Sequence, residues 1–336
     1  MNQNIKSLLI FRLGSVGDTV VALPSFKLIK KAFPETKLFA LTNMPVNHKA
    51  CALELILENT GLIDHFIEYP SKSSLWQKIL GLRKIIKKNH FQTMIYFHQT
   101  RSILQAWRDF LFFKLCGIKK IIGLSLLRHG FQYRYHSSIK LYESEHYRLA
   151  NQLKVLGEIN WQDSNLMNLN LTQNEFQKAR QVIASIAKQD FIVCSIGTKL
   201  NMKDWGQNNW KKLISNLTAI YAQYACIFIG VQDEYQRSEE LLKLWTGSTI
   251  NLCGKLSIRE SAAVLSFAKL FIGHDSSPMH LASAVNTTCV AIFSNHAKPG
   301  CWYPLGLQHQ IIYPTGKTIQ SITVDQVVNT ISAVLK

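Results

Sequence analysis

The stretch SLLIFRLGSVGDTVVALPSFKLIKK, residues 7–31, decides the fold class. It opens with a short apolar run, Ser7 to Phe11, which ends at the glycines of GSVGD, and from Thr19 to Lys31 apolar residues recur at helical spacing. This order predicts a buried strand, a tight turn and a helix. A unit of this kind is typical of a parallel sheet wrapped by helices.

Units of the same kind recur along the chain in two series. In the first series, apolar runs predict strands at 37–42, 66–69 and 93–97, and helices at 75–88 and 104–116. In the second series, strands are predicted at 191–196, 226–230, 270–273 and 288–293, and helices at 174–187, 210–221, 234–245 and 279–285. The alternation of strands and helices predicts an α/β protein.

The length and a polar gap predict two domains. The chain has 336 residues, more than the roughly 250 that one hydrophobic core usually serves. The polar stretch Asn160 to Asn174 separates the two series. We therefore predict domains at 1–165 and 166–336. The last helix, Val324 to Leu335, has no obvious place in the second sheet and could pack back on the first domain.

The composition excludes several classes of protein. Hydrophobic residues make up 47% of the chain, which excludes global disorder. No apolar run approaches the ~20 residues that span a bilayer. Seven scattered cysteines without a Cys-x-x-Cys pair indicate a reducing compartment, the cytosol. The polar start, Met1 to Lys6, lacks the apolar core of a signal peptide, so we expect the mature chain to be the whole chain.

The charge of the chain is strongly positive and uneven. With 38 Lys+Arg and 21 Asp+Glu, the formal net charge is +17. Residues 1–165 hold 23 basic and 11 acidic side chains (23 − 11 = +12), and residues 166–336 hold 15 and 10 (15 − 10 = +5). The excess includes Arg83, Lys84, Lys87, Lys88, Arg101, Arg108, Lys119, Lys120, Arg128 and Arg134. Such a surface attracts nucleic acid, anionic lipid headgroups or a phosphorylated glycan, although basic faces also serve solubility alone.

The first candidate site follows the first predicted strand, at Gly14, Ser15, Val16, Gly17 and Asp18. Open α/β sheets bind ligands at this edge, because turn glycines admit close backbone approach and the helix start presents free N–H groups. The spacing G-x-G-x-x-G of dinucleotide-binding proteins is absent, and no Gly-Lys-Ser/Thr of a P-loop follows. A nicotinamide cofactor therefore gains no support.

Asp18 has two interpretations. As a first-turn acid it would stabilise the helix start through the helix dipole by ~0.3 to 1 kcal/mol, which is common at such positions. As a functional residue it would be an ionised carboxylate at the ligand edge, able to accept a proton from a substrate hydroxyl. The spacing alone favours the first interpretation.

The second candidate site is IGTKLNMKDW, residues 196–205, after the first strand of the second series. Thr198, Lys199 and Lys203 would line a loop at the sheet edge, where a hydroxyl and two ammonium groups suit a diphosphate. The alternative is a loop whose lysines are simply solvated. Trp205 and Trp210 are interpreted as packing residues that fix the loop.

The third candidate site is GHDSSPMH, residues 273–280. Pro278 fits the first helical position, which places Ser276 or Ser277 at the cap and leaves N–H groups facing outward to bind an anion. Asp275 either binds sugar hydroxyls or stabilises the loop. His280 is more typical of a buried histidine than of a catalyst. No Asp-x-Asp occurs in the chain, so a carboxylate-bound metal gains no support.

These three motifs, in this order, resemble the glycosyltransferase family that contains the ADP-heptose:lipopolysaccharide heptosyltransferases. The resemblance rests on FRLGSVGDTVVALPSFKLIKKAFP (11–34), GTKLNMKDWGQNNW (197–210) and FIGHDSSPMHLASAVNTTCVAIF (271–293). It implies the GT-B architecture, in which two Rossmann-like, doubly wound parallel-sheet domains face each other across a cleft. It also implies that the first domain binds the acceptor and the second binds the sugar nucleotide.

The resemblance assigns roles residue by residue. Asp18 takes the place of the general base, with Gly14, Ser15 and Gly17 beside it on the acceptor side. The donor-binding positions are Thr198, Lys199, Lys203, Asp275, Ser276, Ser277 and His280. One position departs from the family: within 230–234, where an acid that recognises the nucleotide ribose is expected, the best match is Gln232. The departure leaves the base and the sugar of the donor open.

The implied reaction is an inverting transfer of a heptose from ADP-heptose to the lipopolysaccharide core, with no metal or other cofactor. The resemblance also implies an anionic acceptor and a cytoplasmic protein that associates peripherally with the inner membrane. One alternative is another donor, a UDP-hexose or UDP-N-acetylhexosamine; others are a nucleic-acid-binding protein and a non-catalytic sugar-nucleotide sensor. Against a nucleic-acid partner, the aromatic residues lie mostly in apolar periodic stretches, and no RNA or DNA module signature occurs.

Overall fold

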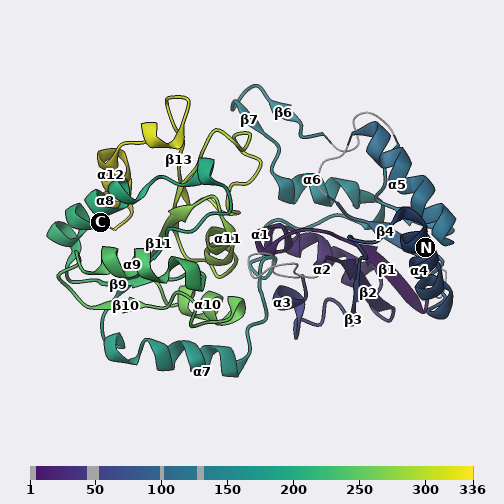
Figure 1. The fold of residues 1–336 in the computed structure, drawn as a ribbon, viewed down its shortest axis with the longest axis horizontal. Coiled ribbons are helices and arrows are strands. Elements are labelled where there is room, and N and C mark those ends of the chain that lie inside the picture. Colours follow the sequence, from purple (N-terminus) through teal and green to yellow (C-terminus); the bar gives the residue numbers. More distant parts are fainter. Residues whose placement is uncertain (1–4, 44–52, 99–101, 127–131, 336) are drawn as a thin grey trace. The chain divides into compact units, whose positions relative to one another are not determined.

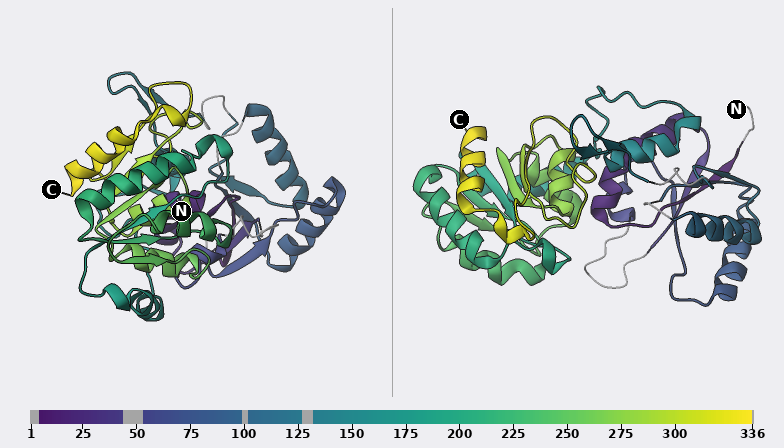
Figure 2. Two further views of the ribbon diagram at one scale, coloured as in Figure 1. Left: turned by 60° about the vertical axis from the view of Figure 1, so that its left-hand side comes forward. Right: turned by 90° about the horizontal axis from the view of Figure 1, so that it is seen from above.

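The computed structural model describes residues 5–43, 53–98, 102–126 and 132–335. The chain divides into two compact units, Met1–Leu166 and Met167–Lys336. Each unit is built on one parallel sheet flanked by helices (Figures 1 and 2). The predicted α/β fold class is confirmed.

The sheet of the first unit has the strand order β3-β2-β1-β4-β5, and every neighbouring pair is parallel. Its strands are β1 (Ser7–Phe11), β2 (Lys37–Thr42), β3 (His65–Glu68), β4 (Thr93–Tyr96) and β5 (Lys120–Ile122). Its helices are α1 (Val16–Val21), α2 (Leu23–Ala32), α3 (Glu54–Leu57), α4 (Leu75–Lys88), α5 (Ile103–Cys116) and α6 (Glu145–Gln152). A hairpin of β6 (Tyr135–His136) and β7 (Leu141–Tyr142) precedes α6. The strand order reverses between β1 and β4, which is where open α/β sheets bind ligands.

Strand β1 is buried on both faces, as expected for the central strand of a parallel sheet. Leu9 and Phe11 lie in the apolar cluster that the sheet forms with α4 and α5. Toward α2, Phe97 packs edge to face on Phe26, with ring centres 5.1 Å apart. The apolar run at the start of the chain therefore carries the core of the first unit.

The helix predicted over 19–31 is two helices in the structure. Helix α1 ends at Val21, Ala22 is shared as the cap, and α2 begins at Leu23 with a proline in its first two positions. Pro24 has no N–H to donate, and its ring clashes with the carbonyl four residues earlier, so it cannot continue α1. Helix α1 is therefore a single short segment that carries Asp18.

The sheet of the second unit has the strand order β10-β9-β8-β11-β12-β13 and is parallel throughout. Its strands are β8 (Phe191–Ser195), β9 (Ala225–Phe228), β10 (Thr249–Asn251), β11 (Leu270–His274), β12 (Cys289–Ile292) and β13 (Gln310–Ile312). Its helices are α7 (Gln173–Val182), α8 (Gln207–Tyr221), α9 (Tyr235–Leu242), α10 (Ile258–Leu265), α11 (Ser277–Ala284) and α12 (Val324–Val334). Here the order reverses between β8 and β11.

The last helix, α12, belongs to the second unit. It contacts α8, β12 and β13, and its Val327 and Ile331 are fully buried in the core of that unit. The structure therefore gives α12 a place in the second unit that the sequence did not reveal. The reason is β13, an edge strand absent from the prediction, which extends the sheet and gives α12 a surface to cover.

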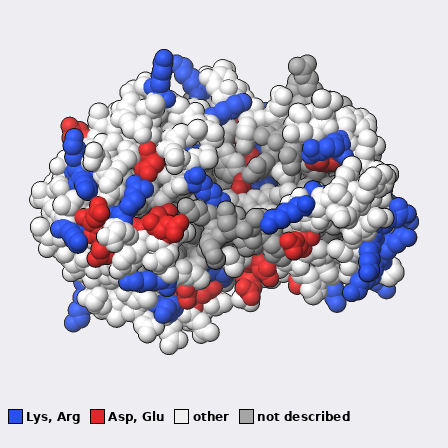
Figure 3. All heavy atoms as spheres, in the orientation of Figure 1, with Lys and Arg blue, Asp and Glu red and all other residues white. Residues whose placement is uncertain are grey.

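Basic side chains gather on the first unit along α4 (Figure 3). Arg83, Lys84, Lys87 and Lys88 are all exposed on this helix. Arg101 and Arg128, which belong to the predicted basic surface, lie outside the described residues. Four of the eight described cations of this surface thus lie on α4.

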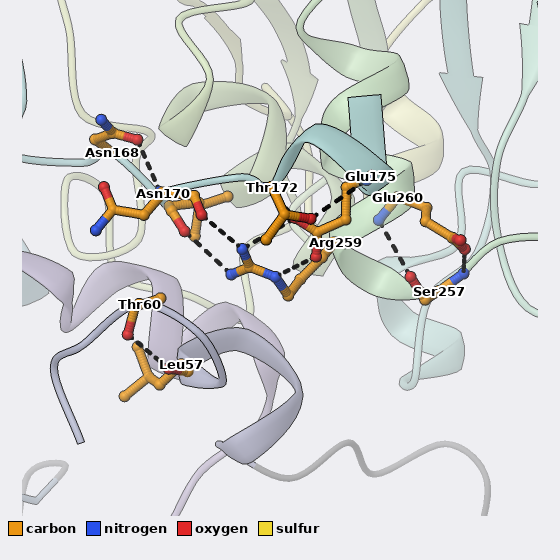
Figure 4. A network of polar contacts seen from close by, with 10 residues as sticks. Leu57, Thr60, Asn168, Asn170, Thr172, Glu175, Ser257, Arg259 and Glu260 are labelled. Atoms are coloured by element: carbon orange, nitrogen blue, oxygen red, sulfur yellow. Dashed lines mark hydrogen bonds and ion pairs between the residues drawn. The ribbon is translucent and has the colours of Figure 1, made fainter. Parts of the chain in front are cut away.

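Arg259 of α10 fixes the segment with which the second unit begins (Figure 4). Its guanidinium donates to Glu175 Oε1 at 2.5 Å and to Glu175 Oε2 at 3.1 Å. The same group donates to the carbonyl oxygens of Leu169 at 3.1 Å and Asn170 at 3.0 Å. Five fixed N–H groups make arginine suited to hold a carboxylate and a backbone turn at once.

No helix within the described ranges is both long and apolar enough to cross a bilayer. The six cysteines in these ranges are buried and form no disulfide with one another, and Cys51 lies outside the ranges.

Candidate functional site

Asp18 lies in the first turn of α1, at the carboxyl edge of the first sheet. Its Oδ2 accepts hydrogen bonds from the Ser15 backbone N–H at 2.6 Å and from the Ser15 hydroxyl at 2.8 Å. These bonds match the interpretation of Asp18 as a first-turn acid. The side chain is nevertheless only partly buried. The carboxylate is therefore held in one place without being sealed into the core.

Gly14 is needed for the position of Asp18. A Cβ atom at Gly14 would lie 2.6 Å from the Cβ of Asp18, which is closer than real Cβ atoms approach. The Gly14 N–H donates to the side-chain oxygen of Asn43 at 2.8 Å, which ties the turn to the end of β2. Of the other residues predicted on the acceptor side, Ser15 is the cap of α1 and Gly17 is buried within it.

Arg12 contacts the backbone of Asp18. It was not among the site residues predicted from the sequence. Its Nη2 donates to the backbone oxygen of Asp18 at 2.8 Å, and its guanidinium stacks on the ring of Phe97 at 4.9 Å. The side chain is fully buried. Burial lowers the pKa of Arg12, and the nearby carboxylates of Asp18 and Glu145 act in the opposite direction. In the sequence, the signal that could have pointed to Arg12 was its position directly after a strand predicted to be buried.

A second buried arginine lies at the same sheet edge. Arg148 of α6 forms a two-pronged ion pair with Glu145, with distances of 2.5 Å from Nε and 2.7 Å from Nη2. Its Nη2 also donates to the carbonyl oxygen of His98, just after β4, at 2.7 Å. The guanidinium groups of Arg12 and Arg148 are thus buried near the Glu145 carboxylate, and the Asp18 carboxylate lies near Arg12 as well.

In the second unit, the structure brings Lys203 and Asp275 together. Their Nζ and Oδ2 atoms are 2.5 Å apart, although the residues are 72 positions apart in sequence. Lys203 follows β8 and Asp275 follows β11, and these two strands are neighbours at the point where the strand order reverses. The lysine side chain is 19% exposed and the aspartate 5% exposed. The pair therefore lies at the carboxyl edge of the sheet, at the position where open α/β sheets bind ligands.

The other residues of the second motif lie outside this pair. Thr198 closes a local turn, because its hydroxyl donates to the Leu200 carbonyl at 2.7 Å and accepts from the Leu200 N–H at 3.1 Å. Lys199 is exposed, and it forms no hydrogen bond or ion pair with the described part of the chain. Both residues are thus in the loop, but among the described residues neither is hydrogen-bonded to Lys203 or Asp275.

The third motif begins helix α11 as predicted, with one residue of difference. Ser276 is the cap, Ser277 is the first helical residue, and Pro278 follows it. The early proline loses no bond here, because the first N–H groups of a helix have no internal partner. His280 is buried, with its ring against Trp302 at 6.2 Å. It matches the expected buried histidine more than an exposed ligand contact.

Trp205, Trp210 and His274 hold the Lys203 loop against the sheet. The backbone N–H of Trp205 donates to Nε2 of His274 at 3.2 Å, and the Trp210 ring lies edge-on to the His274 ring at 5.6 Å. Both tryptophans are fully buried, as predicted for packing residues. Burial lowers the pKa of His274 to about 4. The histidine is therefore neutral near pH 7 and can accept the bond that positions the loop.

His274 should make the stability of the fold depend on pH. Its folded pKa of about 4 lies below the usual value near 6.5. As the pH falls, the unfolded chain takes up this proton first, so the stabilisation is complete above pH ~6.5 and is lost progressively toward pH ~4. In His274→Gln, which cannot titrate, the free energy of unfolding should fall less steeply over this range. Denaturant titrations at several pH values measure this, and equal slopes for both proteins would contradict it.

Glu234 is a candidate for the acid that recognises the nucleotide ribose. It was not predicted from the sequence, where Gln232 was the best match. A Cβ atom at Gly197 would lie 1.8 Å from Glu234 Oε1, and one at Gly230 would lie 1.9 Å from Oε2. The carboxylate therefore lies against the two glycines that follow β8 and β9, and it accepts from the Val231 N–H at 3.2 Å. Gln232 is exposed and extends over Gly254 instead.

The described ranges contain no group of three or more His, Cys, Asp or Glu side chains arranged to hold a metal ion. What the second unit offers a ligand is an ammonium, two carboxylates and the start of a helix: Lys203, Asp275, Glu234 and the first turn of α11. Cations and helix starts bind phosphate groups, and carboxylates accept hydrogen bonds from hydroxyl groups. The arrangement suits a molecule that carries both phosphate and sugar.

Comparison with known proteins agrees with this chemistry. The lipopolysaccharide core heptosyltransferase OpsX of Haemophilus influenzae is 23% identical to this chain, over 87% of the chain and 80% of the relative. A family 9 glycosyltransferase of Veillonella parvula has a similar structure, with a TM-score of 0.75 and 17% identity over 100% of this chain and 98% of that one. The Escherichia coli heptosyltransferase WaaC with ADP-2-deoxy-2-fluoro heptose has a TM-score of 0.63 and 15% identity, over 97% and 99% of the two chains.

These neighbours have the GT-B fold, and the two sheets described above are those of that fold. Residues 128–324 match glycosyltransferase family 9 (heptosyltransferase). This region contains the second and third motifs, including Lys203, Glu234 and Asp275. The chain therefore belongs to glycosyltransferase family 9, the heptosyltransferase family.

Proposed function

We propose that this protein transfers a heptose from ADP-heptose to the lipopolysaccharide core, by an inverting reaction that needs no metal ion. The observation that carries the proposal is the Lys203–Asp275 pair at the reversal point of the second sheet. Membership of the heptosyltransferase family supports the reaction class. The related WaaC structure, which contains an ADP-heptose analogue, supports the donor.

On the donor side, negative charge grows on the diphosphate as the bond to the sugar breaks. Lys203 and the N–H groups at the start of α11 supply positive potential that becomes more favourable as this charge develops. When the Lys203 ammonium binds the diphosphate, the Asp275 carboxylate accepts hydrogen bonds from hydroxyl groups of the sugar. Thr198, Lys199, Ser276, Ser277 and His280 stay as predicted neighbours of the donor.

The carboxylate of Glu234 supplies the acid that the sequence analysis expected at Gln232. Its position against Gly197 and Gly230 suits two hydrogen bonds from the neighbouring hydroxyls of a ribose. The UDP-sugar alternative was motivated by Gln232, which has no carboxylate at the position that best matches the family's acid. Because Glu234 supplies a carboxylate here, the residue at 232 no longer favours a UDP-sugar. The nucleotide base of the donor is left to experiment.

On the acceptor side, Asp18 accepts the proton of the attacking hydroxyl. The two bonds from Ser15 hold the carboxylate in place, and Arg12 anchors the backbone of the same residue. A single base with no second carboxylate acting as nucleophile corresponds to inversion at the anomeric carbon. The excess of basic residues in 1–165 suits an anionic acceptor at the cytoplasmic face of the inner membrane.

A panel of sugar nucleotides tests the donor. ADP-heptose should raise the melting temperature more than UDP-, GDP- or CMP-sugars, because a ligand that binds only the folded state stabilises it, by about 2.7 kcal/mol at 100 times its Kd. Transfer to a heptose-deficient core should proceed equally in EDTA and in Mg²⁺. A shift with a UDP-sugar but not with ADP-heptose would replace the donor, and no shift with any of them would overturn the proposed function.

A further inference from the structure

Helix α5 is apolar on the face that points away from the core. Leu104, Trp107, Leu111 and Leu115 are 45–79% exposed. Their spacing of three and four residues places them along one side of the helix. The opposite side, with Phe113 among its residues, is buried in the core. A surface helix usually carries polar residues on its outer side. Packing of the core therefore does not account for the apolar residues on the outer side of α5.

Helix α4 continues this exposed surface. Leu75, Trp76 and Leu80 in its first half are 61–72% exposed, whereas its core side is buried. The two helices pack side by side (Figure 2). Arg83 Nη1 of α4 donates to the carbonyl of Leu115 in the last turn of α5 at 3.3 Å. We call the exposed apolar side chains of the two helices the α4–α5 face: Leu75, Trp76, Leu80, Ile103, Leu104, Trp107, Leu111 and Leu115.

Exposed apolar residues are concentrated on this face. Among the described residues, eight of the nineteen large hydrophobic side chains that are exposed lie on α4 or α5. Single exposed hydrophobic residues are normal on a protein surface, but a continuous patch marks an interaction site. The concentration of exposed apolar side chains on the α4–α5 face is therefore typical of an interaction site.

The charges around the face indicate the kind of partner. Exposed cations border the apolar residues on both helices and just after them: Arg83, Lys84, Lys87, Lys88, Arg108, Lys114, Lys119 and Lys120. The single acid on the two helices, Asp109, is buried and bonded to Tyr96 and Arg108. A second copy of the chain docked on this face would bring like charges together. An apolar stripe with tryptophans and a cationic border instead matches an anionic lipid surface.

We propose that the α4–α5 face binds the surface of an anionic lipid bilayer. Trp76 and Trp107 lie at the boundary between headgroups and acyl chains, where tryptophan is favoured. The lysines and arginines of the border contact lipid phosphates. This binding is separate from the transfer reaction, and it holds the protein on the membrane whether or not a sugar nucleotide is present.

Vesicle flotation with the full chain tests the proposal. Wild-type protein should float with vesicles of phosphatidylcholine and about one third phosphatidylglycerol, and bind vesicles of phosphatidylcholine alone much more weakly. The double variant Trp76→Ser/Trp107→Ser should bind the anionic vesicles at least tenfold more weakly. The triple variant Lys84→Gln/Lys87→Gln/Lys88→Gln should bind about a hundredfold more weakly at low salt, at roughly fivefold per cation.

Matched controls use the second unit. Ile220→Ser removes an exposed apolar residue of α8, and Lys188→Gln/Lys212→Gln/Lys243→Gln removes three exposed cations. Both should bind vesicles like the wild type. Trp76→Phe/Trp107→Phe should still bind but lose the blue shift of tryptophan emission, because the five remaining tryptophans, at 161, 205, 210, 245 and 302, lie outside the α4–α5 face.

Three results would overturn the proposal. The first is equal binding of the wild type to neutral and anionic vesicles, or no binding to either. The second is a loss of binding in the control variants as large as in the variants of the face. The third is a dimer of the wild type that Trp76→Ser/Trp107→Ser dissociates, which would make the face a contact between copies. Since no sugar nucleotide is added, these results are independent of the donor panel.

Discussion

Asp18→Asn is expected to slow the transfer of sugar by about 100-fold to 10,000-fold, the usual contribution of a general base. The amide cannot take up the proton of the acceptor hydroxyl. Its side-chain oxygen can still accept the hydrogen bonds from Ser15 that fix the start of α1, so the fold is retained. The rate constant kcat, measured with saturating donor and acceptor, reports the loss. The affinity for the sugar nucleotide should stay within twofold, because Lys203 and Asp275 are unchanged.

Asp64→Asn is the matched control for this variant. Asp64 also lies in the first unit and also accepts a backbone N–H, that of Leu38 at 2.7 Å. The same chemical change at this structural carboxylate should leave kcat nearly unaltered. If Asp18→Asn transferred sugar at the wild-type rate, Asp18 would be a helix cap only, and another group would have to be the base.

Lys203→Met is expected to weaken binding of ADP-heptose by about 10-fold to 100-fold, the range for a hydrogen bond to a charged group. Methionine keeps much of the length of the side chain but brings no charge to the diphosphate. The loss is increased by Asp275, whose nearly buried carboxylate then faces the diphosphate without its cation. Calorimetric titration with ADP-heptose measures the dissociation constant.

Two further variants separate these contributions. Lys199→Met removes an exposed lysine of the same loop, and should change the dissociation constant by no more than a few-fold. Lys203→Met/Asp275→Asn removes both charges and should bind ADP more tightly than Lys203→Met alone. With Asp275→Asn and the wild type also titrated with ADP, the cycle gives the coupling between the two side chains. Unchanged affinity in Lys203→Met, or a larger effect at Lys199, would remove Lys203 from the donor site.

Asp275 and Glu234 show why parts of the site needed the structure. The sequence analysis placed Lys203 and Asp275 on separate loops, and their contact follows from β8 and β11 being neighbours in the sheet. Strand order is a non-local property, so spacing along the chain does not reveal it. Likewise, Gln232 and Glu234 are two residues apart, and only the turn after β9 decides which one lies against Gly197.

The sequence by itself determined the succession of strands and helices, the turns at their carboxyl edges and the residues that border them. These are local properties, because the period of apolar residues and the conformational limits of glycine and proline act over a few positions. Tertiary structure alone decided the place of α12, the buried position of Arg12 and the exposure of the α4–α5 face. An apolar stripe has the same period whether a neighbouring element covers it or not, so only the packed fold shows which stripe is left for a partner.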